Sequence, residues 1–414
     1  MTIRPPRTFL ANLINDVMIE SAPPAYARKM AAVTPRKLWQ ARPGDCVVTL
    51  APCAPDFREY VERITGVAVG SVDLVAPDRL ALGHACDVIR DLGAQGRVAS
   101  RTTLVPFVAD RRAVAFARRT NMRLHPYHVL PGPRTLAAID LINTKAGFRA
   151  VAEELGLPVA AGGHASTEPE LVARLEPFVH RHGRAIVKVN RSSNGYGTFV
   201  VDAQRLEPVA TQVRAAVADQ PARACGWVYE QFLPFTAAPS VELTVDVTGP
   251  HEFYLCDQRT RDNAWTGMET PPARTVPAPV RAAAAQIGDW LAARGYRGYF
   301  DVDAGLVGDT FVVTEANVRR TGGTYLEELA RRLMPDGPTR WRADARRGTT
   351  RLDFARAVRA LDHAGLADPK APARALLLVD TLELDGLWRY LVIGRSADAV
   401  AATEHELTHL LELT

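Results

Sequence analysis

Three side chains around one predicted β-hairpin carry the oxygen atoms that a divalent cation needs. Gly308–Asp309 separates two β-rich runs, which is a hairpin signal. Asp303 lies on the first run, and Glu315 and Asn317 lie two residues apart on the second, so both point to one face. Converging oxygens of this kind suit Mg2+, and Arg319 could bind a phosphate oxygen. A hairpin with ordinary solvated polar side chains is the alternative interpretation.

A second candidate is a loop of small residues that follows a predicted strand containing Lys188. The small residues of the loop are Ser192, Ser193, Gly195 and Gly197. Glycines let backbone N–H groups approach phosphate oxygens, and lysine is a mobile point charge that suits a phosphate. A strand follows the loop and no GxxxxGK(S/T) occurs, so this is not a Walker P-loop. A flexible β-hairpin is the alternative.

Two carboxylates lie in otherwise apolar strands further along the chain. Glu230 ends the run Val-Tyr-Glu, and a buried carboxylate requires a partner, which the exocyclic amine of adenine could provide. Glu242, in Ser-Val-Glu-Leu-Thr-Val, could accept hydrogen bonds from ribose hydroxyls. Each could equally be an ion-pair partner or an edge-strand charge.

Within residues 140–335 these segments follow one another in a definite order. The series consists of Lys145 before a helix ending in Gly-Leu-Pro, Lys188 with its loop, Glu230, Glu242, Asp303 and Glu315-x-Asn317-x-Arg319. In this order and spacing the region resembles the ATP-grasp superfamily. Only five of the 50 basic residues are lysines, and two of them fall where that superfamily has its phosphate-binding lysines.

The resemblance implies a role for each member of the series, with ATP and Mg2+ (or Mn2+) as cofactors. The ATP phosphates would bind Lys145, Lys188, Ser193, Gly195 and Gly197. Adenine would contact Glu230, Gln231 and Leu233, and ribose would contact Glu242. The metal ligands would be Asp303, Glu315 and Asn317. The catalytic side chains would be Arg319, Lys188 and Arg259.

A finer resemblance, to pre-ATP-grasp peptide ligases of the pheganomycin type, rests on three short segments. These are Asn-Leu-Ile-Asn-Asp from Asn12, Pro-Gly-Asp-Cys-Val-Val-Thr from Pro43, and Asn-Val-Arg-Arg-Thr-Gly-Gly-Thr from Asn317. The chain departs from the amide-ligase pattern at Asp301, where some relatives have an arginine near the acyl phosphate. The identity of the oxyanion contact is therefore open, and Arg259, Arg261 or Arg320 could provide it.

The expected fold is α/β, with an ATP-grasp fold preceded by an α/β pre-ATP-grasp domain and followed by a small α+β module. The expected domains are residues 1–135, an N-lobe at 136–225, a C-lobe at 226–335 and the module at 336–414. Alternating strand-like and helix-like runs in the first 140 residues predict a largely parallel sheet. We further expect one helix from about 136 to 155, a helix capped by Thr167 with Glu170, and a mobile loop at 258–276.

The expected activity is ATP-dependent ligation of a carboxylate to an amine through an acyl phosphate, with small-molecule or peptide substrates. Arg259, Arg261, Trp265 and Arg274 in the 258–276 loop suggest an anionic substrate, or else a solvated face. A homodimer would fit relatives of this kind. A degenerate protein that binds ATP without ligating is the alternative function, although the lysine and metal positions are intact.

A competing motif, His405-Glu-Leu-Thr-His409, matches the HExxH signature of zinc hydrolases. Only five residues follow His409, so the usual third ligand is missing downstream. Helical periodicity places the histidines on the side opposite the apolar residues Val400 and Leu407, facing solvent. We therefore expect no zinc hydrolase, although the pair could capture a metal adventitiously.

Composition places the chain among ordinary globular proteins. It has 414 residues, 47% hydrophobic and 23% charged, with a net charge of +4. No run of 18 apolar residues and no uninterrupted apolar N-terminal run occur, so we expect neither membrane insertion nor secretion. Five scattered cysteines without a CxxC pair indicate a reduced, cytoplasmic protein. No basic cluster is interleaved with aromatic residues, so nucleic acid is not an expected partner.

Overall fold

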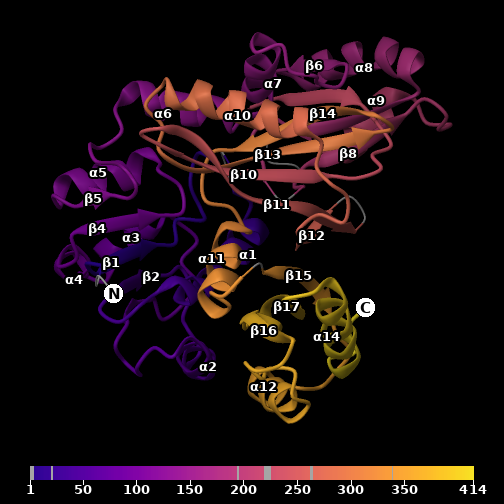
Figure 1. Ribbon diagram of the computed structural model, residues 1–414. Helices are drawn as coiled ribbons and strands as arrows, with labels where there is room; N and C mark the ends of the chain where they lie inside the picture. Colours follow the sequence, from indigo (N-terminus) through magenta and orange to yellow (C-terminus); the bar gives the residue numbers. More distant parts are fainter. Residues whose placement is uncertain (1–3, 20–21, 194, 219–224, 262–263, 338) are drawn as a thin grey trace.

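The computed structural model of the chain describes residues 4–19, 22–193, 195–218, 225–261, 264–337 and 339–414. In these ranges the strands form sheets of five, eight and four strands, shown in Figure 1. Within the same ranges, no helix combines the length and the apolar character needed to span a bilayer.

The N-terminal domain is built on a five-stranded parallel sheet. Its strands, in spatial order, are β3 (Asp73–Val75), β2 (Cys46–Val48), β1 (Arg7–Leu10), β4 (Thr103–Pro106) and β5 (Arg123–Leu124). The helices are α1 (Pro24–Ala32), the 3-10 helix η1 (Thr34–Gln40), α2 (Pro55–Thr65), α3 (Ala85–Asp91), α4 (Gln95–Ala99) and α5 (Arg111–Arg119). β2 and β4 are buried along their whole length, which is typical of parallel strands covered on both faces. The predicted parallel sheet is confirmed.

The single helix predicted from 136 to 155 is wrong, because two helices occupy this region: α6 (Pro133–Ile142) and α7 (Lys145–Glu154). The break lies at two short polar residues whose side chains bond to nearby backbone. The Asn143 amide donates to the Ile139 carbonyl at 2.7 Å, and the Thr144 hydroxyl accepts from the Gly147 N–H at 3.0 Å. Such bonds compete with helix continuation and cap a new helix. As a result, Lys145 is the first residue of α7.

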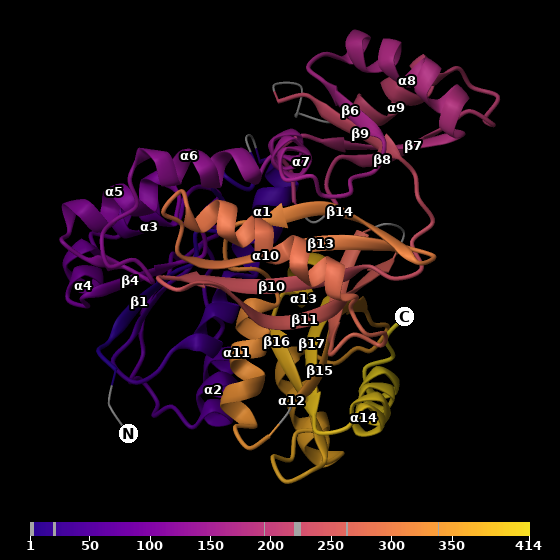
Figure 2. The ribbon, with the colours of Figure 1, turned by 45° about the horizontal axis from the view of Figure 1, so that its top comes forward.

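The N-lobe is a four-stranded antiparallel sheet with two helices on one face. In Figure 2 it lies at the upper right, apart from the rest of the molecule. The strands are β6 (Gly162–Ala165), β9 (Trp227–Gln231), β7 (Arg184–Val189) and β8 (Thr198–Asp202), and the helices are α8 (Glu168–His182) and α9 (Val209–Val217). Alternate residues such as Val187 and Val189 form a core of their own with the helices. The predicted cap is confirmed, since the Thr167 hydroxyl accepts from the Glu170 N–H at 3.3 Å.

The C-lobe sheet contains the hairpin that the sequence predicts at Gly308–Asp309. β13 (Gly298–Val307) and β14 (Thr310–Asn317) are joined at Gly308, which has φ +56°, so the predicted turn is confirmed. The sheet continues through β10 (Pro239–Asp246) and β11 (Gly249–Arg261), with α10 (Ala278–Ala292) packed on it. α11 (Thr324–Leu333) follows the hairpin at the centre of the molecule (Figure 1).

The loop predicted at 258–276 is also wrong. β11 runs to Arg261 and pairs with β12 (Ala264–Thr270), with Gln258 opposite Met268. The alternation of apolar and polar residues that predicts a strand is weak here, because both faces of the ribbon carry polar residues. Gly267 also breaks the pattern, yet a Cβ added there would lie 1.9 Å from the Ala343 carbonyl of the next strand. The glycine is therefore required by the close approach of two strands.

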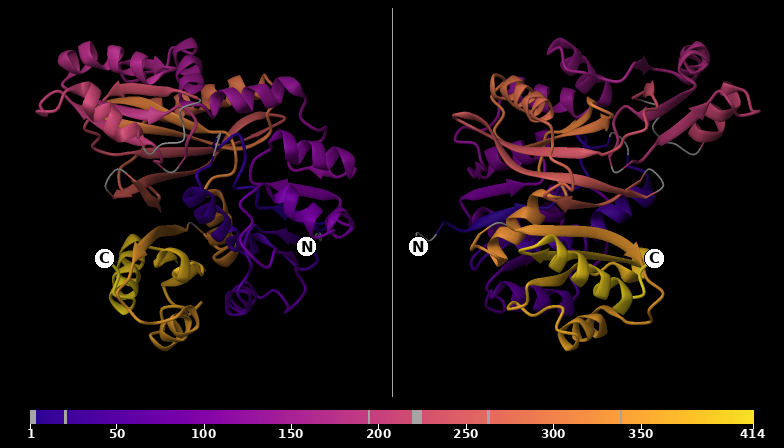
Figure 3. Two further views of the ribbon diagram at one scale, coloured as in Figure 1. Left: turned by 180° about the vertical axis from the view of Figure 1, so that it is seen from behind. Right: turned by 45° about the vertical axis from the view of Figure 1, so that its right-hand side comes forward.

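Residues 336–414 have the predicted α+β composition, but their strands belong to the C-lobe sheet. β15 (Arg340–Arg347), β17 (Leu387–Gly394) and β16 (Ala373–Val379) extend it beyond β12 to eight strands. The helices are α12 (Phe354–His363), α13 (Leu382–Asp385) and α14 (Ala397–Leu410). This last segment also packs on the N-terminal domain: the Trp39 indole donates to the Leu378 carbonyl at 2.9 Å. Figure 3 shows the last segment, coloured yellow, in the lower part of the molecule in both views.

Candidate active site

A cavity of about 560 Å3 lies where the N-terminal domain, the C-lobe sheet and the last three strands meet. The loops after β1 and β4 contribute Leu13 and Phe107 to its lining. The chain leaves β1 and β4 in opposite directions across the sheet, and the crevice at such a point is where open α/β folds bind ligands. A hollow of about 590 Å3 beside β8 and α9 contains none of the predicted metal ligands. The first cavity is therefore the candidate site.

The predicted metal ligands are brought together on one wall of this cavity. Asp303 pairs with Glu315 and Asp301 with Asn317 across β13 and β14, and all four residues line the cavity. Burial, reinforced by Asp301 and Glu315, raises the pKa of Asp303 well above its usual range. The buried Asp303 Oδ1 has no hydrogen-bond partner.

These residues fit a divalent cation that shares its ligands with phosphate. Within the described ranges, no three His, Cys, Asp or Glu side chains are arranged to hold a metal on their own. Two carboxylates and an amide would leave coordination positions for phosphate oxygens, which is how Mg2+ is commonly bound. An ion here would also satisfy the orphan oxygen of Asp303 and relieve the repulsion among the carboxylates.

Asp301 orients Asn317. Its Oδ1 accepts from the Asn317 backbone N–H at 3.0 Å and from the Asn317 side-chain amide at 2.8 Å. The other end of that amide, Oδ1, accepts from the Arg319 guanidinium at 2.6 Å. Burial raises the pKa of Asp301 to about 7, with the Glu242 charge adding to the effect. Sequence reasoning did not find this positioning role, although equal spacing along the two strands was a signal for it.

The wall formed by Asp301, Asp303, Glu315 and Asn317 is called the acidic wall below. Both predicted phosphate lysines lie close to it, although neither lines the cavity. Lys145 Nζ is 3.5 Å from Glu315 Oε1 and donates to the Ser192 carbonyl at 3.1 Å. Lys188 Nζ donates to Glu230 Oε2 at 2.7 Å. Burial lowers the pKa of Lys188, but Glu230, and then Glu315 and Asp303, raise it, and the net shift is upward.

Glu230 has protein partners, as the ion-pair alternative anticipated. In addition to Lys188, the Arg149 guanidinium lies 3.5 Å from its Oε1. Gln231 and Leu233 follow at the end of β9, where the chain crosses from the N-lobe to the C-lobe, and neither lines the cavity. The structure thus groups the three predicted adenine contacts at the junction of the lobes, and the contact itself stays a prediction.

The small-residue loop closes against the N-terminal domain. The Ser193 hydroxyl hydrogen-bonds to the Tyr26 hydroxyl of α1, and the Tyr26 and Tyr196 rings lie 5.9 Å apart. Gly195 and Gly197 have φ of +73° and +71°, a conformation that favours glycine. Gly195 lines the cavity, so this loop forms one of its edges.

Glu242 lies beneath the acidic wall. It is 1% exposed, accepts from the Thr321 hydroxyl at 2.6 Å and also accepts from the Thr324 hydroxyl. Burial raises the pKa of Glu242 to about 7. Its oxygens are thus occupied by the turn before α11, and it is absent from the cavity lining, which does not favour the predicted ribose contact.

Comparison with known proteins agrees with this arrangement of lobes. A model described as the Pre ATP-grasp domain matches residues 34–122. The chain matches the N5-carboxyaminoimidazole ribonucleotide synthetase of Thermus thermophilus over 98% of both chains, at 14% identity and a TM-score of 0.58. This chain has the ATP-grasp fold.

Two further solved structures share the ATP-grasp fold with it. Biotin carboxylase from Campylobacter jejuni matches 99% of this chain over 92% of its own, at 12% identity and a TM-score of 0.63. N5-carboxyaminoimidazole synthase from Aspergillus clavatus, in complex with ADP and 5-aminoimidazole ribonucleotide, matches 99% of this chain over 98% of its own, at 12% identity and a TM-score of 0.56. Identities this low establish the fold alone. No curated protein matches the chain.

Arg259 lies outside the cavity of this ATP-grasp fold. Its guanidinium pairs with Glu404 of α14 and lies 3.6 Å from Asp344. Its predicted catalytic role therefore has no support from its position. Among the three arginines named as oxyanion contacts, Arg261 lines the cavity, whereas Arg320 is buried in an ion pair with Glu328. Arg319 also lines the cavity, and its contact with the transferred phosphate stays a prediction.

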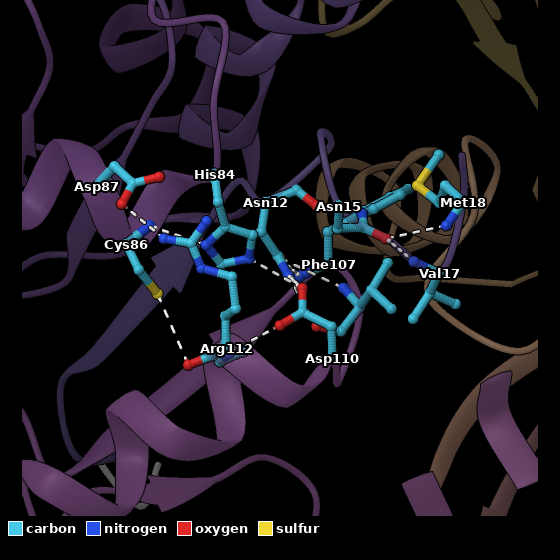
Figure 4. A network of polar contacts seen from close by, with 12 residues as sticks. Asn12, Asn15, Val17, Met18, His84, Cys86, Asp87, Phe107, Asp110 and Arg112 are labelled. Atoms are coloured by element: carbon cyan, nitrogen blue, oxygen red, sulfur yellow. Dashed lines mark hydrogen bonds and ion pairs between the residues drawn. The ribbon is translucent and has the colours of Figure 1, made fainter. Parts of the chain in front are cut away.

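A buried network in the pre-ATP-grasp domain, which sequence reasoning missed, holds the cavity lining in place (Figure 4). The Asn12 amide donates to Asp110 Oδ2 at 2.7 Å and to the Val108 carbonyl at 2.8 Å, and its oxygen accepts from the Phe107 N–H at 2.8 Å. His84 Nε2 lies 2.9 Å from Asp110 Oδ2. The network therefore joins the ends of β1 and β4. The available signal was an asparagine, Asn12, within the apolar run 9–14 that the sequence predicts as a strand.

In the part of the chain that the structure describes, the two histidines of the HExxH segment are not part of a group of three or more metal-ligating side chains. His405 and His409 are exposed on α14, as predicted, and their i,i+4 spacing places them on its outer face. The buried acid of this helix is Glu404, which is bound by Arg259, Tyr390 and Arg342. Glu406, the glutamate of the motif, is exposed.

Proposed function

We propose that this protein is an ATP-dependent carboxylate–amine ligase that acts through an acyl phosphate. The observation that carries the proposal is the contact between Lys145 and Glu315, 170 residues apart, at 3.5 Å. It places a cation beside a carboxylate wall that contains the unpartnered Asp303 oxygen. A bound triphosphate requires a positively charged side chain close to carboxylates that can hold its Mg2+ ion.

In this proposal ATP binds between the lobes, with Lys145 and Lys188 on its phosphates and Glu230 to Leu233 beside adenine. Asp303, Glu315 and Asn317 hold Mg2+, which supplies charge neutralisation on the phosphate oxygens. Arg319 faces the transferred phosphate. The fold supports this arrangement, since one solved neighbour with the same fold was determined in complex with ADP.

The first chemical step is phosphoryl transfer to the acid substrate. A carboxylate oxygen attacks the γ-phosphorus, the bond to the bridging oxygen breaks, and ADP leaves with the electron pair. In this proposal Lys188 and Arg319 stabilise the charge that spreads over the transferred group. In the second step the amine attacks the acyl carbon, phosphate leaves, and the amine loses a proton, giving an amide.

An acyl phosphate hydrolyses readily, so the site must exclude water. The small-residue loop serves this purpose through its contact with α1, where Ser193 meets Tyr26. Substrates of the peptide-ligase type, carboxylates and amines of amino acids or short peptides, are the finer form of the proposal.

The test is an ADP-release screen of paired amino acids and short peptides, with mass spectrometry of the products. We expect at least one pair to release ADP and to yield a product whose mass equals the sum of the two substrate masses minus one water. ATP binding without ADP release across the panel would instead indicate a nucleotide-binding protein without catalysis.

Two variants test the site itself. Lys188→Ala should abolish turnover, and Glu315→Gln should remove Mg2+-dependent ADP formation. Lys370→Ala, an exposed lysine away from the cavity, is the control and should retain full activity. Full activity of the Lys188 variant would refute the assignment.

A further inference from the structure

The cavity has a basic wall formed by the two ends of the chain. Lys29 of α1 and Arg36 of η1 come from the pre-ATP-grasp domain. Arg347 of β15 and Arg389 of β17 come from the last strands, and all four line the same cavity as Asp303. These side chains are brought together by the packing of residues 24–40 against the final segment, which the sequence order does not reveal.

Several of these cations lack a counter-ion. In the parts of the chain that the structure describes, Lys29, Arg36 and Arg347 form no ion pair within 4 Å. The Arg36 Nε is buried and has no hydrogen-bond partner. By contrast, Arg389 is paired with Asp385. The Arg36 guanidinium lies 5.3 Å from the centroid of the Tyr325 ring, whereas Lys29 and Arg347 are exposed to solvent at the cavity. An anionic ligand would therefore supply the opposite charge that the described carboxylates do not.

The electrostatics of the wall agree with this geometry. Burial lowers the pKa of Lys29, and the charge of Arg389 lowers it further, with only Asp385 acting in the opposite direction. Burial also lowers the pKa of Arg36, where Arg389 again acts as a like charge while Tyr325 opposes it. Like charges therefore lie close together in the same cavity that the carboxylates Asp301, Asp303 and Glu315 line.

Apolar side chains also line the cavity. They are Met18, Met30, Val33 and Trp265. Lys145 and Lys188 do not line it, although Lys145 lies 3.5 Å from Glu315. None of the four residues of the basic wall is a predicted contact of the triphosphate.

We propose, building on the ligase function above, that the acid substrate carries a second anionic group that binds this wall. Its reacting carboxylate lies beside Arg319, its apolar middle lies on the methionines, and Lys29 and Arg36 hold the distal carboxylate or phosphate. The substrate class is therefore an acid with at least two negative groups separated by an apolar spacer.

The test measures direct binding to the full chain without nucleotide, by calorimetry in a phosphate-free buffer. The probes are tricarballylate, with three carboxylates, 3-phosphoglycerate, with a phosphate and a carboxylate, and hexanoate, with one carboxylate. We expect either multiply charged probe to bind at least tenfold more tightly than hexanoate, and added salt to weaken it. The tighter of the two identifies the distal group as carboxylate or phosphate.

Arg36→Met and Lys29→Met keep the apolar stem and remove the charge. Each should weaken the multiply charged probes at least tenfold. The matched controls are Arg28→Met, exposed on α1, and Lys370→Met, and both should bind as the wild type does. If one variant fails to fold, as judged by circular dichroism, the other still decides the question.

Equal affinity for hexanoate and the multiply charged probes would overturn the proposal, as would unchanged binding by the folded variants. Loss of probe binding in Lys188→Ala would also overturn it, because the probe would then occupy the triphosphate site. These readouts need no ADP release. A protein that binds the probes yet never releases ADP therefore fails as a ligase but keeps its anion site.

Discussion

The ion pair between Lys188 and Glu230 offers a test that separates folding from catalysis. The two atoms are 2.7 Å apart and the side chains are 15% and 10% exposed, in the middle of the N-lobe sheet. Lys188→Met leaves the Glu230 carboxylate with only Arg149, at 3.5 Å. Removing one partner of a buried pair typically costs about 3–5 kcal/mol, and Arg149 places this case near 3 kcal/mol.

Glu230→Gln should cost less, about 2 kcal/mol, because Lys188 keeps the attraction of Glu315 and Asp303. The double variant, with a neutral pair, should also lose about 2 kcal/mol, which gives a coupling energy of about 3 kcal/mol. If Lys188 binds phosphate, Lys188→Met should lose ADP formation, and the double variant should not recover it.

The assay is native-state hydrogen exchange of the β7 and β9 peptides, since the N-lobe has its own hydrophobic core and opens as a unit. In Lys188→Met, protection in these strands should fall by about a hundredfold, at roughly 1.4 kcal/mol per factor of ten. Arg174→Met, which breaks an exposed pair with Glu170 in the same lobe, should leave protection unchanged. Unchanged protection in Lys188→Met, or strictly additive effects in the double variant, would refute the reasoning.

Three further predictions concern stability. Burial raises the folded-state pKa of Glu242 to about 7. The folded state therefore binds the extra proton, and nucleotide-free protein should lose stability as pH rises from about 4.5 to about 7, by up to about 3 kcal/mol. Glu242→Gln should flatten that part of the melting-temperature profile, and an unchanged pH slope would contradict the assignment. Gly267→Ala should destabilise the β12–β15 junction by about 3 kcal/mol in urea melts, because its Cβ would collide with the Ala343 carbonyl; Gly96→Ala, with open space around it, is the control. Asn12→Ala should cost about 3 kcal/mol, since the Val108 N–H and the Val108 carbonyl both lose their hydrogen bonds to the Asn12 side chain. A melting temperature equal to that of the wild type would show that water replaces the Asn12 side chain.

Predictions that depended on local chemistry agree with the structure. The Gly308–Asp309 turn and the Thr167 cap each follow from residue type and spacing over a short stretch, and the parallel N-terminal sheet follows from the alternation of strand-like and helix-like runs. Asp303, Glu315 and Asn317 also come together, but the turn alone does not decide their pairing. The register that starts at the turn would place Asp303 opposite Thr314, and a β-bulge between Asp303 and Ala304 places it opposite Glu315 instead.

Predictions that depended on distant neighbours fared less well. The β11–β12 ribbon was missed because its glycine and polar residues make sense only beside β15. Glu242 and Arg259 have residue types that suit the predicted ribose contact and catalytic role. In the structure, however, the Thr321 and Thr324 hydroxyls donate hydrogen bonds to Glu242, and Arg259 donates one to Glu404. A carboxylate in a strand looks the same in the sequence whether its partner is a ribose or a hydroxyl 79 residues away.

The sequence alone determined the order of the motifs, the hairpin with its oxygen ligands, and the lysines that precede it, because each is encoded over a few adjacent residues. The tertiary structure decided which side chains share the cavity. Packing of the last strands against α1 and η1 creates the basic wall, and the lobe junction brings Lys145 to Glu315. Contacts of this range depend on how whole elements pack, and residue spacing along the chain does not specify that packing.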